Sequence, residues 1–296
     1  MKSQHIIILK IGADCELFIK NNRGQAIPVI GKLGGTKLDP KPVLENIGKG
    51  YAVQEDNVMA EFNIPAHGEV TGFITSINRM LGHLSAHFLA YGAIDSPYHL
   101  DIVPSAVFSK QALDHPQAQE IGCEADVNVW TGKMNGSPKE HPMTAYLRTS
   151  GAHVHTSYVS VDLITGEQGY PTKEDVHQFV KMEDLFKGVP SILLDKDKRR
   201  RVLYGKAGAF RYKDYSPGFA GSEYRVLSNF WLTRDVLKAW VFQQTLLCAK
   251  KMREENIDFN KGGLGELVQR TINNGDEETA LSLCSEFDIK CPQLKY

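Results

Sequence analysis

The order in which strands and helices are expected along the chain most constrains its fold. Apolar residues that alternate or run together between turn residues predict extended segments. The segments cover residues 6–20, 25–30, 51–65, 99–108, 126–130 and 144–161, with further pieces within 201–231. Several strands therefore follow one another without an intervening helix, which predicts an α+β fold rather than a doubly wound parallel sheet.

Apolar residues at helical spacing predict four helical regions. The regions are 69–91, 172–187, 233–255 and most of 265–287. Thr172 and Thr233 are the expected N-caps of the second and third regions. Gly188 and Pro190 are expected to close the second region. No repeat or clear linker divides the chain, and we expect a single domain over residues 1–296.

The charge balance excludes a general nucleic-acid binder. The chain has 34 Lys and Arg residues against 35 Asp and Glu residues, which gives a formal net charge of −1. Because there is no basic surplus, no nucleic-acid partner is expected. The one basic run, residues 198–201, is expected to be a solvated turn before a strand.

Membrane and export signals are not expected either. The apolar-leaning stretch 70–93 is interrupted by Asn78, Arg79 and two histidines, so it does not predict a membrane span. The first apolar run of the chain is too short for a signal peptide. Five scattered cysteines without a CxxC pair argue against a disulfide framework or a structural zinc site. Together these features predict a cytoplasmic protein.

Four of the extended segments each carry two polar residues at positions i and i+2. The pairs are Asp14/Glu16, Glu61/Asn63, His153/His155 and Glu223/Arg225. Residues two apart on a strand face the same side of the sheet. A solvated sheet face explains any one pair, whereas four pairs of metal-binding or anion-binding types favour an active-site floor. Acidic residues gathered there repel one another, so a bound cation is expected.

The residue types indicate which cation and which chemistry. The acidic members are Asp14, Glu16, Glu61 and Glu223. Oxygen ligands favour Mg²⁺ or Mn²⁺ over Zn²⁺, and Mg²⁺ is usually held together with substrate phosphates. The arginines that suit such phosphates are Arg148, Arg201, Arg211 and Arg225. A metal with carboxylates and arginines indicates phosphoryl chemistry.

Short segments at these positions resemble the glutamine synthetase superfamily. Residues 150–157 resemble the glycine–histidine strand of glutamine synthetase, and residues 12–16 resemble the paired-acid first strand of glutamate–cysteine ligase. Residues 59–65 look like the later acidic strand of that ligase, which ends in proline. Residues 222–226 are similar to the Glu-x-Arg strand of both enzymes, and the order of the four segments also matches.

Within that superfamily the chain most resembles the phage-type carboxylate–amine ligases. The matching segments are residues 31–37, 56–65, Gly122-Cys123 with Asp126, 148–158 and 204–231. The resemblance covers about residues 10–235, and the last sixty residues contribute nothing to it. It implies a curved, mainly antiparallel sheet with an active-site face and helices packed on the other side. The single catalytic domain would comprise a ligase core at about 5–235 and a helical extension at 236–296.

The resemblance also implies an activity. The γ-phosphate of ATP would pass to a substrate carboxylate, and an amine would attack the acyl phosphate to give an amide, ADP and phosphate. The partners would be a small-molecule or peptide carboxylate and an amine, in the cytoplasm of a phage-infected bacterium. Oligomers are possible, because the larger glutamine synthetases assemble.

Site residues follow from the resemblance by position. The implied metal ligands are Asp14, Glu16, Glu61, His153 and Glu223. The residues implied to bind ATP are His153, His155, Lys206 and Arg211. The implied catalytic arginines are Arg148, Arg201, Arg211 and Arg225. Two positions depart from the larger enzymes: Asp14 stands where they tend to have Glu, and Arg148 stands where glutamine synthetase has an asparagine.

Two other functions remain open from the sequence. His153 and His155 could instead hold the zinc ion of a metal-dependent hydrolase. A non-catalytic phage protein with a ligase-like fold would carry the same segments without their chemistry. The glycine-rich residues 31–37 do not form a P-loop pattern, because Gly-Lys is not followed by Ser or Thr.

Overall fold

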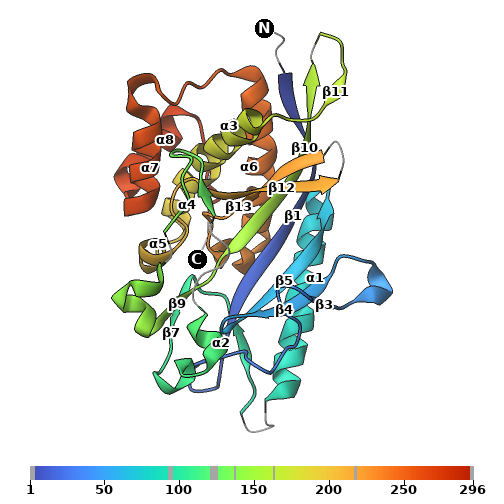
Figure 1. Cartoon of the computed structure of the whole chain (residues 1–296), viewed down its shortest axis with the longest axis vertical. Coiled ribbons are helices and arrows are strands. Elements are labelled where there is room, and N and C mark those ends of the chain that lie inside the picture. The colour runs from blue at the N-terminus through green and yellow to red at the C-terminus, as the bar shows by residue number, and fades with distance from the viewer. Residues whose placement is uncertain are drawn as a thin grey trace.

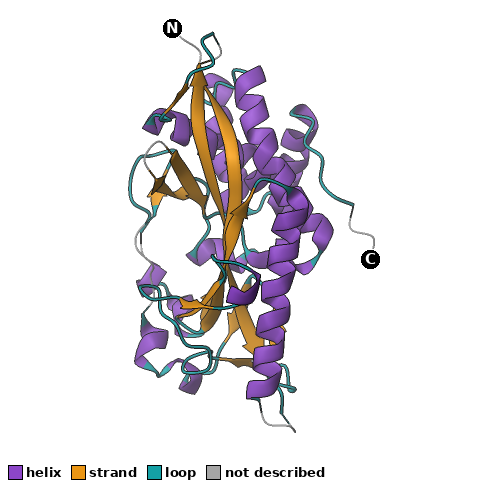
Figure 2. Cartoon of the chain, turned by 90° about the vertical axis from the view of Figure 1, so that its right-hand side faces the viewer, coloured by secondary structure: helices purple, strands orange, loops and turns teal. Residues whose placement is uncertain are grey.

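The computed structural model of this chain describes residues 4–92, 96–120, 126–136, 138–162, 164–216 and 219–293. The Gly122-Cys123 segment of the sequence resemblance lies outside these residues. Strands form one large sheet that runs the length of the molecule, and helices pack along it (Figure 1). Figure 2, turned by 90°, shows long helices lying along one side of the strands.

An eleven-stranded sheet forms the centre of the described part of the chain, and each of its pairings is antiparallel. The order along its main path is β3-β4-β5-β1-β10-β13-β12-β8, while β2 and β6 also pair with β1, and β11 pairs with β10. The strands are β1 (Gln4–Lys20), β2 (Ala26–Ile27), β3 (Lys41–Pro42), β4 (Ala52–Asp56), β5 (Met59–His67), β6 (His99–Asp101), β8 (Val127–Asn128), β10 (Ala152–Asp162), β11 (Gln168–Gly169), β12 (Ala209–Ser216) and β13 (Phe219–Tyr224). Strands β7 (Ser105–Val107) and β9 (Leu147–Thr149) make a separate pair. The predicted α+β class with a large antiparallel sheet is confirmed.

The helices lie mainly on the side of the sheet away from the polar pairs. They are α1 (Val70–Tyr91), α2 (Pro116–Gln119), α3 (Lys173–Glu183), α4 (Val189–Leu194), α5 (Arg199–Leu203), α6 (Asp235–Glu254), α7 (Leu264–Asn274) and α8 (Glu277–Glu286). Short 3₁₀ turns lie at Glu45–Ile47, Gln111–Leu113, Pro138–Glu140, Pro142–Ala145, Asn229–Thr233 and Lys261–Gly263. None of the helices in the described ranges is long and apolar enough to cross a membrane.

Strand β1 shows how the sequence sets the two faces of the sheet. Every second residue from Ile11 to Ile19 is apolar and fully or almost fully buried toward the helices: Ile11, Ala13, Cys15, Leu17 and Ile19. They share one core with the inner face of α1 and with residues of α6, α7 and α8. Because side chains alternate along a strand, Asp14 and Glu16 face the opposite side.

Residues 51–65 fold as a hairpin rather than one extended segment that stops at Pro65. The chain turns at Asn57, which has a positive φ of 55°, and β5 continues past Pro65 to His67. Opposite Pro65 the register of β1 shifts between Ile11 and Ala13, so Gly12 faces two residues of β5. Such a bulge accommodates a residue that has no N–H for the ladder.

The expected end of the second helical region is wrong. Helix α3 does have Thr172 as its N-cap, but the chain then continues through a π-helical turn, Asp184–Gly188, directly into α4. Pro190 lies in the first turn of α4, where a missing N–H is tolerated. The wider π turn before it changes the hydrogen-bond register of the helix.

The basic run at residues 198–201 is not a turn before a strand, and only its first two residues, Lys198 and Arg199, are solvated as expected. It lies at and in α5, with Arg200 only 2% exposed and Arg201 only 7% exposed. Their guanidinium groups are buried because backbone carbonyls and carboxylates surround them. Thr233 also differs from its expected role, since it ends a 3₁₀ turn and Arg234 takes the N-cap position of α6.

Other expected strands are shorter or divided. Segment 99–108 forms β6 and β7, and segment 144–161 begins with a 3₁₀ turn and then forms β9 and β10. Only Val127–Asn128 and Ala26–Ile27 are strands within 126–130 and 25–30. The helical tail is two helices, because Gly275 at φ 61° ends α7 and Asp276 caps α8.

Candidate functional site

Three of the polar pairs lie on the neighbouring strands β5, β1 and β10, and the fourth lies at the end of β13, with Glu223 on the strand and Arg225 just after it. The antiparallel register places Asp14 opposite His153, Glu16 opposite Glu61, and His155 opposite Glu223. Residues more than 200 positions apart in the sequence therefore share one face of the sheet. The predicted gathering of these pairs on a single face is confirmed.

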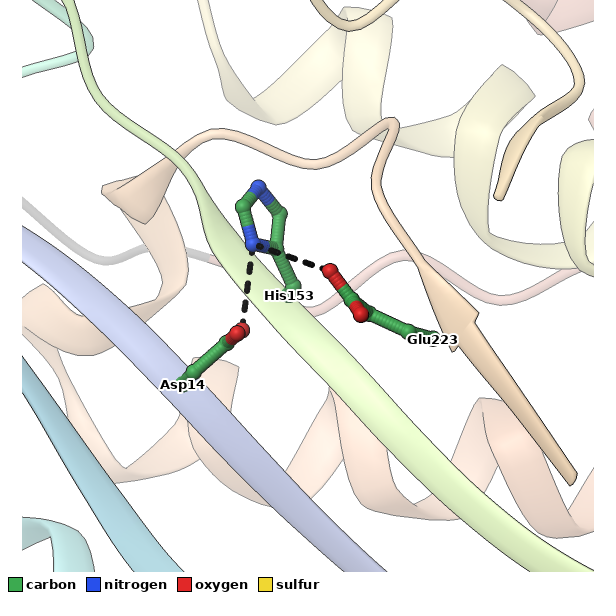
Figure 3. Close-up of side chains that lie close together, drawn as sticks. All are labelled: Asp14, His153 and Glu223. Atoms are coloured by element: carbon green, nitrogen blue, oxygen red, sulfur yellow. Dashed lines mark ion pairs between the residues drawn. The ribbon is translucent and has the colours of Figure 1, made fainter. Parts of the chain in front are cut away.

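Asp14, His153 and Glu223 form the first group, which we call the histidine–acid cluster. His153 Nδ1 lies 3.1 Å from Asp14 Oδ1 and 3.9 Å from Glu223 Oε1. Figure 3 shows the three side chains pointing toward one another from β1, β10 and β13. Ligand atoms of all three lie within 4.8 Å of one another, which is compatible with a shared metal ion.

Glu16, Asp56 and Glu61 form the second group, the acid cluster. One ligand atom from each lies within 4.8 Å of the others. Glu16 Oε2 accepts a hydrogen bond of 2.5 Å from the backbone N–H of Gly151, and Asp56 pairs with Lys37 Nζ at 2.9 Å. Asp56 was not among the predicted ligands. Its position two residues after Gln54 on β4 is the same i, i+2 signal that singled out the other acids.

The carboxylates of the acid cluster are buried or half-buried and repel one another. Burial raises the pKa of Glu61 well above its usual value, and the nearby charges of Asp14, Asp56 and Glu16 raise it further. Burial also raises the pKa of Glu16, although His153 opposes that shift. Carboxylates crowded in this way fit a hard cation, because its charge offsets both the desolvation and the mutual repulsion.

The histidine–acid cluster is held ionised by neighbouring cations. Burial raises the pKa of Asp14, but His153 and His155 outweigh that effect and hold it well below the usual value. The pKa of Glu223 is about 2: burial and Asp14 raise it, while Arg225 and the two imidazoles lower it by more. These shifts keep both carboxylates deprotonated, the state that a metal ion requires.

Cations surround Glu223 from the β12 side. Lys213 Nζ lies 2.7 Å from Glu223 Oε2, and Arg211 Nη1 lies 3.3 Å from Oε1. Arg225 also pairs directly with Glu223. Lys213 was missed in the sequence, although it lies two residues from Arg211 on the same strand and faces the same side.

His155 lies next to the histidine–acid cluster and contacts both Asp14 and Tyr215. Its Nε2 lies 3.3 Å from Asp14 Oδ2, and its Nδ1 lies 3.2 Å from the hydroxyl of Tyr215. Burial lowers the pKa of His155, but Asp14 and Glu223 together raise it by more, and the net pKa is above the ordinary value. The two histidines thus share one carboxylate.

A cavity of about 500 Å³ borders the acid cluster. Glu16 and Asp56 contribute to its wall. The other polar residues that line it include Lys37, Asn57, Glu120, Asp126, Asn135, His141, Arg148, Tyr204 and Lys206, next to apolar residues such as Met59, Leu147 and Leu203. This volume is in the range that encloses a drug-sized ligand, and both charge signs are present at its wall.

The predicted arginines occupy different environments. Arg225 lies between the two clusters and the cavity: it pairs with Glu223, contacts Asp126 at 3.3 Å and stacks 5.4 Å from the ring of Tyr204. Arg201 instead faces Asp195 at 3.8 Å and donates to the Asp197 carbonyl at 3.2 Å, within and beside α5.

Arg148 lines the cavity, but its guanidinium group donates hydrogen bonds to other residues of the protein. It donates to Asn57 Oδ1 at 3.1 Å and to the carbonyls of Thr144, Leu147 and Ala118 at 2.5, 2.9 and 2.8 Å. These bonds tie the wall segments of the cavity together. A role toward a substrate stays a prediction for Arg148, as it does for Arg201.

Arg200 was not among the predicted site residues and was expected to be solvated. It donates to the carbonyls of Ser150 and Val226, each at 2.7 Å, and of Leu227 at 3.0 Å, and so joins the start of β10 to the end of β13. Burial lowers its pKa to about 10, and it remains charged at neutral pH. No polar-pair pattern marks it, because it lies in a helix whose burial only the tertiary structure determines.

Neither a family model nor a curated protein sequence matches this chain. Among solved structures, one described as "Crystal structure of novel glutamine synthase homolog" aligns with 95% of this chain at 9% identity and a TM-score of 0.36. The aligned part spans 66% of that structure's own length. The likeness is weak, and the function therefore rests on the geometry of the side chains.

Proposed function

We propose that this protein is an ATP-dependent carboxylate–amine ligase that forms an amide bond and releases ADP and phosphate. The observation that carries the proposal is the pair of acidic clusters on one sheet face, with arginine and lysine on one side of them and a mixed-charge cavity on the other. Phosphoryl transfer needs charge neutralisation and positioning more than covalent chemistry by the protein, and this arrangement supplies both.

The donor sets fit Mg²⁺ or Mn²⁺. Asp14, His153 and Glu223 would hold one ion, and Glu16, Asp56 and Glu61 would hold a second. When bound, such ions supply positive charge for the phosphate oxygens of ATP. The raised pKa of Glu61 supports this assignment, because the acid cluster lacks enough positive charge of its own.

The remaining side chains would divide between the two substrates. Arg211, Lys213 and Arg225 lie on the β12–β13 side and suit the transferring phosphoryl group. The cavity beside Glu16 and Asp56 suits the carboxylate and the amine, and its walls would hold the two groups near each other. Lys206 at the cavity wall would contact ATP or the substrate carboxylate. Membership of the phage-type family, a cytoplasmic location and assembly into oligomers also belong to this proposal and rest on the sequence.

The direct test measures ADP and phosphate release from Mg-ATP with a panel of amino acids, amines and short peptides. We expect release that requires both a carboxylate and an amine, with an amide product detected by mass spectrometry. Release without either acceptor would indicate a simple ATPase. No release across a broad panel, together with no metal-dependent ATP binding, would instead support a non-catalytic protein with this fold.

A zinc hydrolase is the second candidate, because the histidine–acid cluster combines one imidazole with two carboxylates, the ligand types of catalytic zinc sites. In that case the purified protein would contain stoichiometric zinc and would hydrolyse amide substrates without ATP. Metal analysis and the same substrate panel without nucleotide distinguish the two reactions.

A further inference from the structure

The π turn between α3 and α4 carries a fully buried carboxylate, that of Asp184. Its Oδ1 accepts a hydrogen bond from the hydroxyl of Tyr224 at 2.8 Å, and its Oδ2 accepts one from Trp130 Nε1 at 2.6 Å. The backbone N–H of Gly208 donates to it as well. Three donors from three distant segments therefore converge on one side chain.

Each of these segments carries part of the candidate site. Tyr224 lies on β13 between Glu223 and Arg225, with its side chain on the opposite face of the sheet. Trp130 follows β8 in the segment 126–136, whose Asp126 contacts Arg225. Gly208 belongs to the segment 204–209, which contributes Tyr204 and Lys206 to the cavity.

The segments pack so closely that there is no room for a larger side chain between them. A Cβ on Gly208 would lie 2.5 Å from Trp130 Cδ1, and a Cβ on Gly188 would lie 2.7 Å from the Tyr224 hydroxyl. Asn128 adds a second tie, because its amide donates to the Ala207 carbonyl at 3.1 Å and its oxygen accepts from the N–H of Trp130 at 2.9 Å. Asp184 thus holds three segments at contact distance from behind the sheet.

The charge of Asp184 is costly at this position. Lys187, a buried cation of the same turn, pairs with Glu183 at 2.5 Å and with Thr245 Oγ1 at 2.9 Å instead. A buried carboxylate without an ionic partner destabilises a fold unless hydrogen bonds compensate, and an apolar residue would pack there at lower cost. An apolar residue, however, could not accept the hydrogen bonds of the three converging donors.

We propose that Asp184 is a positioning residue for the site: it fixes β13, segment 126–136 and segment 204–209 relative to one another, and through them Glu223, Arg225 and the cavity wall. The proposal rests on the proposed function only because it takes these segments to form the ligase active site. The physical claim concerns their relative position and is measurable without turnover.

The test compares Asp184→Leu and Asp184→Asn with Thr245→Val, which removes a buried hydrogen bond near the same turn without touching the three donors. Hydrogen exchange followed by mass spectrometry should show lost protection in 126–136, 204–209 and 219–224 for Asp184→Leu, with α1 unchanged. Mn²⁺ affinity should fall by about 10- to 100-fold, the range known for residues that orient metal ligands. Asp184→Asn, which keeps one acceptor oxygen, should show the smaller loss, and Thr245→Val should leave affinity and local protection as they are.

Uniform loss of protection over the whole chain, or unchanged Mn²⁺ affinity, would overturn the proposal and leave Asp184 a purely structural residue. If Asp184→Leu does not fold, Tyr224→Phe removes a single donor and should lose protection in 219–224 alone. If the ligase assay fails but the Asp184 variants show the expected hydrogen-exchange changes, the reaction is rejected and the positioning role stands. If the ligase is active but neither hydrogen exchange nor Mn²⁺ affinity changes in the Asp184 variants, the positioning role is rejected and the reaction stands.

Discussion

At the scale of single residues, the site combines side chains that favour the fold with side chains that oppose it. Arg200 favours the fold through the hydrogen bonds that it donates to three buried carbonyls at two strand ends, although burial of its charge lowers its pKa. Glu61 opposes the fold, because burial and the neighbouring acids raise its pKa and make its ionisation costly in the folded chain. Residues of the second kind are retained at functional sites, where a ligand supplies what the protein alone lacks.

Glu61→Gln should separate stability from activity. The amide keeps the size of the side chain and removes a carboxyl group whose pKa is raised well above the usual value by burial and like charges. We expect unfolding in denaturant without added metal to shift to equal or higher denaturant concentration, while Mg-ATP turnover falls at least about 100-fold. Glu45→Gln, at an exposed position outside the site, is the control. Full activity in the Glu61 variant would remove it from the metal site.

Gly205→Ala should destabilise the fold through Arg200. Gly205 has a φ of +73°, and a Cβ there would overlap the Arg200 guanidinium. Gly262→Ala is a matched control, since its φ of +62° carries similar strain but no atom lies within 4 Å of the added Cβ. We expect a loss of about 1 kcal/mol for the control and of at least about 3 kcal/mol for Gly205→Ala, measured by urea unfolding. Equal losses would show that Arg200 moves aside without cost.

At the scale of elements, alternation along strands was predictable from sequence and the ends of elements were not. The helix-facing side chain of Cys15 follows from its place between Asp14 and Glu16, and the structure confirms it. Pro65 and Pro190 were expected to end elements, and neither does. In each case a distortion nearby, the bulge at Gly12 or the π turn before Val189, accommodates the missing N–H. Such compensation depends on the neighbouring strand or turn, which local sequence does not specify.

The π turn should make stability pH-dependent through Asp184. Burial raises the pKa of Asp184 to about 7, above the ordinary value of 3.8. As the pH rises from about 4 to about 7, the unfolded chain loses this proton while the folded chain keeps it, so the free energy of unfolding falls by up to about 1.4 kcal/mol per pH unit. Asp184→Asn does not titrate. The free energy of unfolding in urea, taken relative to that of the wild type, should therefore be higher for the variant at pH 8 than at pH 5. A stability difference independent of pH would contradict the assignment.

At the scale of the whole molecule, the C-terminal helices belong to the same core as the sheet. Residues of α7 and α8 pack with β1 and the π turn in one apolar cluster, and Ile272 lies against Gly188. The resemblance to carboxylate–amine ligases ends near residue 235, so the sequence offered no role for this region. Its burial shows that it stabilises the layer behind the site.

A chain that ends at Gly263 should lose cooperative folding. It lacks the fully or almost fully buried Val268, Ile272, Ala280 and Leu283, and a single buried Leu or Ile cut back to Ala already costs about 2–5 kcal/mol. The sum is comparable with the about 5–15 kcal/mol that stabilises a typical domain. Thermal unfolding followed by near-ultraviolet circular dichroism should show no sharp transition. A chain that ends at Cys291 keeps all four residues and should melt like the full chain, and a sharp transition in both would show that α7 and α8 are dispensable.

The sequence by itself determined the class of fold, the polar face of the sheet and the residues that meet there. Residue alternation is a local property, and Asp14, Glu16, Glu61, His153 and Glu223 already show it in the sequence. Only the tertiary structure decided that these acids divide into two clusters, that Asp56 and Lys213 join them, and that Arg200 and Asp184 hold the surrounding segments. These facts depend on strand register and on which helix residues become buried, and both are set by contacts between segments far apart in the chain.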